Sequence, residues 1–118
     1  MGHIIEDQAC DYLRQKDYCI ICRNYRSRYG EIDIVAGQRS VLVFVEVRYR
    51  KRGSLVTPQE SVNRTKIHRL KLAIRDFLYK HSRIVQDYDS MRVDLICASE
   101  PKDSPSPGFT IIQGIIEF

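Results

Sequence analysis

The sequence has 118 residues, 43% of them hydrophobic, and a formal net charge of +4 at pH 7. These values are typical of one globular domain, so we expect a single domain over residues 1–118 and neither global disorder nor a repeat array. The longest apolar run, Val41 to Val45, is too short to span a bilayer, and the acidic first residues are unlike a secretory signal, so we expect a cytoplasmic protein without a membrane partner.

A helix is predicted over Gly2–Gln15, followed by a strand over Tyr18–Tyr25. In the helix, apolar residues including Ile5 and Leu13 recur at helical spacing. Glu6 lies beside this stripe. It is either a first-turn acid favoured by the helix dipole or an acid that leans toward further carboxylates along the chain.

The stretch from Tyr29 to Arg52 predicts a β-hairpin. Residues alternate in polarity from Glu31 to Ala36, and the run from Val41 to Arg48 is rich in β-branched residues. Pairing Ala36 with Val41 across a four-residue loop gives one wholly apolar face, which a slip by one residue would mix with carboxylates. The other face then carries Glu31, Asp33, Val35, Leu42, Phe44, Glu46 and Arg48.

In this register Asp33 lies opposite Phe44 and diagonal to Glu46, close enough to share a ligand. Two neighbouring carboxylates repel each other and are costly to bury without a compensating charge. A divalent cation such as Mg²⁺ compensates both, together with water and substrate phosphate. The alternative is a solvated sheet face with acids paired to arginines, and the spacing alone leaves both interpretations open.

A long helix ending near Lys80 is predicted next. Thr57 and Pro58 carry helix-start signals, and a restart at Ser61 or Thr65 is also compatible with the pattern. Basic residues crowd the polar side of this helix, which indicates contact with a nucleic-acid backbone or, alternatively, a solvated amphipathic helix. These residues are Arg64, Lys66, His68, Arg69, Lys71 and Arg75.

Two further strands are predicted, over Met91–Ala98 and over Phe109–Phe118 with an interruption at Gly114. They flank a Pro- and Ser-rich loop, Glu100–Gly108. The order of elements predicts an α/β domain with a mixed sheet, because the long helix can cross over and let the Met91 strand pair in parallel.

Gly30 to Asp33, followed by Val43 to Arg48, resembles the YraN family of small bacterial proteins with predicted nuclease folds. The similarity extends to Glu6, Lys66 and Arg92–Asp94. That family is similar to the PD-(D/E)xK nuclease superfamily and, within it, to archaeal Holliday-junction resolvases. The resemblance implies a restriction-endonuclease-like core, a mixed sheet flanked by helices, and Mg²⁺- or Mn²⁺-dependent phosphodiester hydrolysis. It also implies structured DNA rather than RNA as partner, and it is compatible with a homodimer.

The motif's metal-binding acids match Asp33 and Glu46, with Glu6 as a third, helix-borne acid. Arg48 stands where the motif has lysine; it stays protonated, so it can bind phosphate but cannot act as a base. Either Lys66 or Lys51 is available as the missing amine, and the sequence does not decide between them. The expected catalytic set is therefore Asp33, Glu46, Arg48 and Glu6, and the expected nucleic-acid contacts are Arg48, Arg50, Lys51, Arg52, Lys66 and Arg69.

Two competing interpretations remain open. One is a nuclease fold that binds nucleic acid without cleaving it, because Arg48 replaces the lysine. The other is a protein-interaction factor in which the acids are merely solvated. Arg92 and Asp94 match the family pattern, and an exposed structural ion pair explains them equally well.

Overall fold

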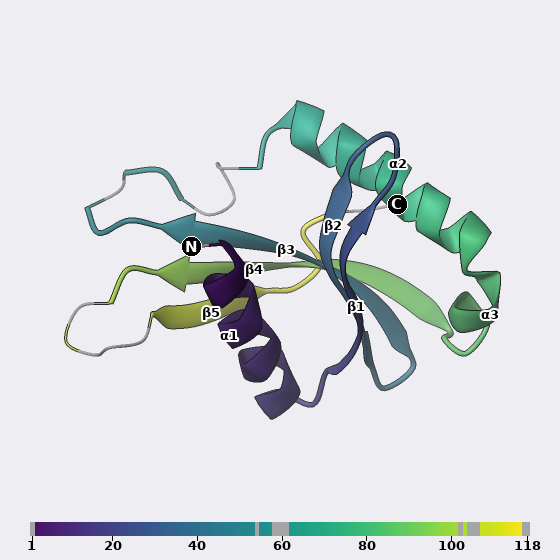
Figure 1. The fold of residues 1–118 in the computed structure, drawn as a ribbon, viewed down its shortest axis with the longest axis horizontal. Coiled ribbons are helices and arrows are strands. Elements are labelled where there is room, and N and C mark those ends of the chain that lie inside the picture. Colours follow the sequence, from purple (N-terminus) through teal and green to yellow (C-terminus); the bar gives the residue numbers. More distant parts are fainter. Residues whose placement is uncertain (1, 54, 58–61, 102, 104–106, 117–118) are drawn as a thin grey trace.

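The computed structural model describes residues 2–53, 55–57, 62–101, 103 and 107–116. It contains three helices and five strands within these ranges (Figure 1). In chain order they are α1 (Gly2–Gln15), β1 (Cys19–Arg26), β2 (Glu31–Gln38), β3 (Val41–Arg50), α2 (Arg64–Lys80), α3 (Ser82–Val85), β4 (Ser90–Ser99) and β5 (Gly108–Ile112). No helix in the described ranges is both long and apolar enough to cross a membrane.

The five strands form one mixed sheet whose spatial order is the same as their order in the chain. Strands β3 and β4 are parallel, and the other neighbours are antiparallel. Helix α2 lies in the connection between the two parallel strands, as a parallel pairing requires. The predicted α/β architecture, with a mixed sheet flanked by helices and compatible with a restriction-endonuclease-like core, is confirmed.

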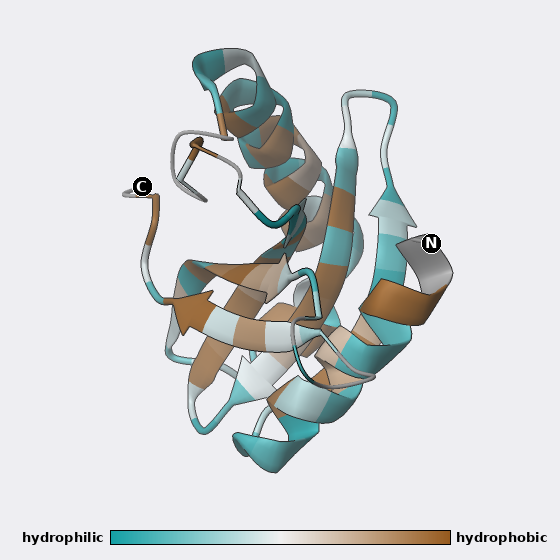
Figure 2. Cartoon of the chain, turned by 90° about the vertical axis from the view of Figure 1, so that its left-hand side faces the viewer, coloured by the Kyte–Doolittle hydropathy of each residue, from teal (hydrophilic) through white to brown (hydrophobic). Residues whose placement is uncertain are grey.

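Both faces of the sheet are buried. On one face Leu13 of α1 packs with Ile34 and Val45, and on the other Phe77 of α2 packs with Phe44. Figure 2 shows hydrophobic segments along the strands between the helices and hydrophilic segments on both helices. Glu46 lies under α2 and is buried, so the alternative of a solvated sheet face is wrong for Glu46, whereas Asp33 is half-buried.

The β2–β3 hairpin has a tighter turn than predicted. Gln38 pairs with Val41, and Ala36 pairs with Val43 rather than with Val41. Arg39, a non-glycine residue, adopts a left-handed conformation with φ of 56°, which lets two residues close the turn. Because the register differs from the predicted one by an even number of residues, each side chain of the paired segment keeps its predicted face.

One residue of the apolar hairpin face, Ile32 of β2, is not on the predicted side of the sheet, and the cause lies in the neighbouring strand β1. Asn24 in β1 has a left-handed φ of 52°, so the residues before and after it point to opposite sides of the sheet. Arg23 reaches Asp7 of α1, whereas Tyr25 donates to Asp76 of α2. Ile32, the cross-strand partner of Tyr25, consequently joins the cluster under α2 rather than the cluster under α1.

Other boundaries also differ from the prediction. Helix α2 begins at Arg64, and its N-cap is Asn63, whose side chain accepts a hydrogen bond from the Lys66 amide. The start predicted at Thr57 and Pro58 runs into residues 58–61, outside the described ranges. Strand β5 ends at Ile112, because the chain turns at Gly114 with φ of 66°, so the predicted strand is too long over residues 113–116, and its end at Phe118 lies outside the described ranges.

Candidate active site

Asp33 and Glu46 meet where the β2–β3 ladder ends. Its last pair is Ile34 with Val45, so continuing the register by one residue places Asp33 opposite Glu46 rather than opposite Phe44. Asp33 Oδ2 accepts a hydrogen bond of 2.8 Å from the Val47 amide. This contact ties the Asp33 carboxylate to the neighbouring strand beside Glu46.

Glu46 is the more deeply buried of the two acids, with only 2% of its surface exposed. Lys66 Nζ lies 2.9 Å from Glu46 Oε1, and Arg48 Nε lies 3.6 Å from the same oxygen. Burial, followed by the negative charge of Asp33, raises the pKa of Glu46 to about 7, although Lys66 and Arg48 oppose this rise. A carboxyl that titrates near neutral pH inside a charged cluster is typical of functional sites.

Helix α2 delivers the amine that the sequence left unassigned. Asn63 Oδ1 accepts the Lys66 amide at 2.9 Å and so fixes the helix start three residues before Lys66. The Lys66 side chain then reaches across to the sheet at Glu46. Lys51 lies in the loop after β3 and lines a different surface hollow from the one that Asp33 and Lys66 line.

Glu6 approaches this pair from α1. Burial and then the Asp33 charge raise the pKa of Glu6, whereas a hydrogen bond from the Asn24 side chain and the nearby Arg23 lower it. Its Oε1 is buried and has no hydrogen-bond partner among the residues that the structure describes, and the Arg23 guanidinium lies 3.9 Å away. Glu6 is thus within electrostatic reach of Asp33. No group of three or more Asp, Glu, His or Cys side chains in the described residues is close enough to hold a metal ion.

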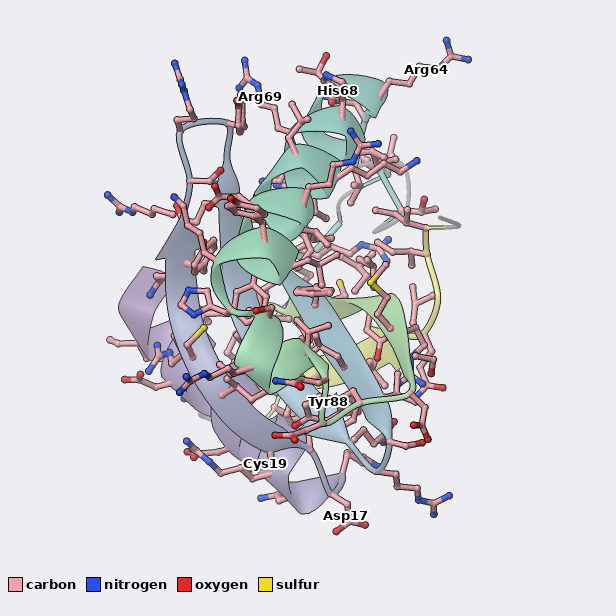
Figure 3. The ribbon with its side chains drawn as sticks, turned by 90° about the vertical axis from the view of Figure 1, so that its right-hand side faces the viewer. Asp17, Cys19, Arg64, His68, Arg69 and Tyr88 are labelled. Atoms are coloured by element: carbon pink, nitrogen blue, oxygen red, sulfur yellow. The ribbon has the colours of Figure 1, made fainter. Side chains whose placement is uncertain are left out.

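An open cavity of about 360 Å³ gives access to the site between α2 and the β1–β2 turn. Asp33 and Lys66 lie in its wall, and Arg69 adds a further cation. Its lining consists of Gly30, Glu31, Asp33, Asn63, Thr65, Lys66, Arg69 and Leu70. Figure 3 shows His68 and Arg69 of α2 at the same end of the molecule as the β1–β2 turn.

Comparison with known proteins identifies the family. The model of the uncharacterised protein family UPF0102 matches residues 5–98, which is most of the chain. The chain belongs to the UPF0102 family. The resemblance to the YraN family, which is this same family, is confirmed.

Individual UPF0102 proteins are similar to this chain along most of their length. One from Carboxydothermus hydrogenoformans is 47% identical over 81 residues, which cover 69% of each chain. One from Pseudothermotoga lettingae is 40% identical over 95 residues, or 80% of this chain and 84% of the relative. A third, from Psychromonas ingrahamii, is 33% identical over 105 residues, or 89% and 83% of the two chains.

The remaining predicted contacts of this UPF0102 protein lie apart from the carboxylates. Arg50, Lys51 and Arg52 line a separate hollow of about 360 Å³ at the end of β3. There the Arg52 amide donates to Glu100 and the Arg52 guanidinium donates to the Pro101 carbonyl. Of the six predicted nucleic-acid contacts, only Arg48, Lys66 and Arg69 therefore lie near Asp33 and Glu46.

Arg92 and Asp94 of the UPF0102 pattern form a buried network, so the alternative of an exposed pair is wrong. Asp94 is fully buried; its Oδ1 accepts from Arg92 Nε at 2.8 Å and its Oδ2 from Arg92 Nη2 at 3.0 Å. The same carboxylate accepts from the Tyr18 hydroxyl and from the Gly114 amide. The network therefore holds β4 against the segment before β1 and the segment after β5.

The titration of Glu46 predicts a pH-dependent stability. The folded protein keeps a proton on Glu46 up to about pH 7, whereas the ordinary pKa of a glutamate is 4.5, so the free energy of unfolding falls as pH rises between these values. Glu46→Gln should therefore stabilise the metal-free protein at pH 8 by on the order of 3 kcal/mol, with little effect at pH 4.5.

Urea unfolding in EDTA at both pH values measures this difference, with Asp87→Asn in an exposed turn as the control for loss of a carboxyl. A destabilised Glu46→Gln protein at pH 8 would show instead that the ion pair with Lys66 outweighs the burial of the charge.

Proposed function

We propose that this protein is a metal-dependent endonuclease-like enzyme that hydrolyses phosphodiester bonds in structured DNA. The observation that carries the proposal is the meeting of Asp33 and Glu46 with the Lys66 amine beside an open, basic cavity. Two acids and an amine are the functional groups that a metal-dependent phosphodiesterase needs to hold a cation, a water molecule and a phosphate.

The residues present fit a Mg²⁺ or Mn²⁺ ion. Asp33 and Glu46 would hold it, and the desolvated Glu46 carboxyl would lose its proton more readily beside the added positive charge of the ion. Glu6, with a buried oxygen that lacks a hydrogen-bond partner, would add negative charge next to Asp33. Because the described residues offer no third nearby ligand, water and substrate phosphate would complete the coordination.

The bound cation would activate water and stabilise the negative charge that develops on the phosphate. Lys66 would orient that water, since its ammonium group already lies 2.9 Å from Glu46. Arg48 would bind the phosphate, because a guanidinium stays protonated and presents paired donors to phosphate oxygens. Arg69, in the wall of the cavity, would contact the backbone of the DNA.

A metal-binding test separates these roles from a purely structural cluster. Saturating Mn²⁺ should raise the Tm of the wild type by on the order of 10 °C at 100 times its Kd, because the ion binds only the folded state. Asp33→Ala should abolish this gain, and Asp87→Ala should preserve it. An equal gain in Asp33→Ala would place the metal elsewhere in the protein.

The activity is tested with labelled four-way-junction, flap and linear DNA in Mg²⁺ or Mn²⁺. Cleavage that stops in EDTA supports the enzyme. Junction binding without cleavage favours the alternative, a nucleic-acid-binding module, which has one specific observation behind it: Lys66 and Arg48 already neutralise Glu46. Binding that does not weaken from low to high salt would count against both, because backbone contacts release counterions.

A further inference from the structure

The turn between β1 and β2 is a rigid projection. The Ser27 hydroxyl accepts hydrogen bonds from the amides of Tyr29 and Gly30 at 3.0 and 3.1 Å, and the Ser27 amide donates to the Gly30 carbonyl. Four residues therefore close the turn with local hydrogen bonds. These bonds fix the backbone from which the side chains at the outer end of the turn project.

This turn exposes an aromatic ring among cations. Tyr29 is 47% exposed, and the Arg28 guanidinium lies 5.6 Å from the centre of its ring. Arg26, the last residue of β1, precedes the turn with most of its side chain exposed, and its Nε lies 3.8 Å from Glu31. Tyr29 therefore presents a half-exposed aromatic face directly beside a guanidinium group, a combination that suits a flat ligand with negative charge.

Helix α2 fixes the direction of the turn. A Cβ atom added to Gly30 would lie 3.1 Å from the Arg69 carbonyl oxygen, so the glycine lets the turn pack directly on the helix backbone. Between the turn and the helix lies an open hollow of about 850 Å³. Arg26, Arg28, Tyr29, His68 and Arg69 lie in its wall.

The hollow adjoins the active-site cavity. Gly30, Glu31 and Arg69 line both, so a strand bound at Asp33 and Lys66 would be able to extend toward Tyr29. We propose that this hollow binds unpaired nucleotides next to the scissile phosphate, with Tyr29 stacking on a base and Arg26, Arg28 and Arg69 on phosphates. The inference rests on the proposed function and narrows its substrate to nucleic acid with unpaired bases on this side of the site.

Stacking and charge together favour this ligand over an acidic peptide. Every base has a flat face that stacks on an exposed aromatic ring, and the flanking arginines can bind the phosphates that accompany it. An acidic peptide would satisfy the arginines but would bring no base to stack on Tyr29. Paired bases are already stacked on one another and offer no free face to Tyr29. A duplex without unpaired nucleotides should therefore gain nothing from this ring.

Fluorescence anisotropy of labelled oligonucleotides tests the inference in Ca²⁺, which removes cleavage from the measurement. Tyr29→Ala should weaken binding to a duplex with a three-nucleotide gap or flap by about 10-fold and leave a blunt duplex unaffected. Tyr29→Phe should retain the affinity of the wild type. Tyr79→Ala, which removes an 87% exposed tyrosine from the far end of α2, is the matched control and should change neither affinity.

The chain contains no tryptophan, so Tyr29→Trp introduces a single fluorescent reporter. Its emission should be quenched by the gapped substrate and not by the blunt duplex, and DNA and RNA versions of the gap identify the preferred sugar. Equal weakening of both substrates by Tyr29→Ala, an absence of quenching, or equally effective displacement by polyglutamate would each overturn the inference.

Cleavage of the same substrates in Mn²⁺ keeps the two proposals distinguishable. Loss of the Tyr29 effect with intact cleavage would refute the stacking site alone. A Tyr29-dependent preference without any cleavage would refute the enzyme and leave the binding site, and an absence of binding by the wild type would refute both.

Discussion

Asp33→Asn should lower the rate of DNA cleavage by about 1,000-fold or more while leaving DNA binding intact. The amide is nearly isosteric with the carboxylate, and its oxygen can still accept the hydrogen bond from the Val47 amide. What it loses is the negative charge that would hold the cation, and a loss of about 4 kcal/mol of transition-state stabilisation corresponds to this factor. Removing an acid from a cavity that binds a polyanion should strengthen rather than weaken binding.

Cleavage and binding are measured on the same four-way junction, at matched concentrations of Mg²⁺ or Mn²⁺. Asp87→Asn, in the turn before β4, removes the same charge far from the cavity and should cleave as the wild type does. Undiminished cleavage by Asp33→Asn would move the reaction away from this site. If neither protein cleaves and both bind, the binding module is the better interpretation, and Arg48→Lys then shows whether a lysine at the motif position restores activity.

Asp94→Ala should destabilise the protein by about 3–5 kcal/mol, because it leaves the partly buried Arg92 without its counterion. The substitution also removes the acceptor for the Tyr18 hydroxyl and the Gly114 amide. For a domain whose total stability is of the order of 5–15 kcal/mol, such a loss is a large fraction of the whole.

The chain offers its own control for this prediction. Asp11 and Arg14 form an exposed ion pair of 3.1 Å on α1, so Asp11→Ala should cost less than about 1 kcal/mol. Urea unfolding of both alanine variants measures these losses. It is then measured for Arg92→Met, for Asp94→Leu and for the variant that combines them. If the combined variant loses as much stability as the sum of Arg92→Met and Asp94→Leu, the pair is not coupled, and the burial of Asp94 alone explains its cost.

Local pattern was sufficient for most of the fold. Helix α1 has the predicted bounds because its apolar spacing is regular from Gly2 to Gln15. The hairpin faces were predicted correctly for the paired segment, since alternation determines the face whichever even register forms. The register itself depends on the left-handed conformation of Arg39, which cannot be predicted from the residue type, because arginine rarely adopts it. Gly37, which was expected in the turn, lies within β2 instead.

The sequence was sufficient to predict which acidic residues of the candidate site lie together, but not which basic residue joins them. Asp33 and Glu46 lie on adjacent strands, so strand pairing alone brings them together. Lys66 and Lys51 were equivalent in the sequence, because only the path of α2 across the sheet decides which reaches Glu46. Asn63, a frequent N-cap residue immediately before Arg64, was the local signal that would have located the helix start.

Asp94 illustrates a limit of local inference. Alternation along β4 assigns it a face, and its neighbour Arg92 supplies an obvious ion pair. Its burial, however, depends on Tyr18 and Gly114, which are far away in the chain and approach it only in the folded sheet. Long-range partners of this kind decide whether a charged residue is solvated, and no window of sequence contains them.

The irregular shape of β1 also bears on how copies of this protein coexist at high concentration. An outermost strand with a straight backbone invites another chain to extend the sheet, which leads to aggregation. Here β1 is outermost, but its register shifts between Ile20 and Cys22, and Asn24 turns its backbone aside. A neighbouring strand would find few hydrogen bonds in sequence along it, so the feature that redirects Arg23 and Tyr25 also discourages polymerisation through this edge.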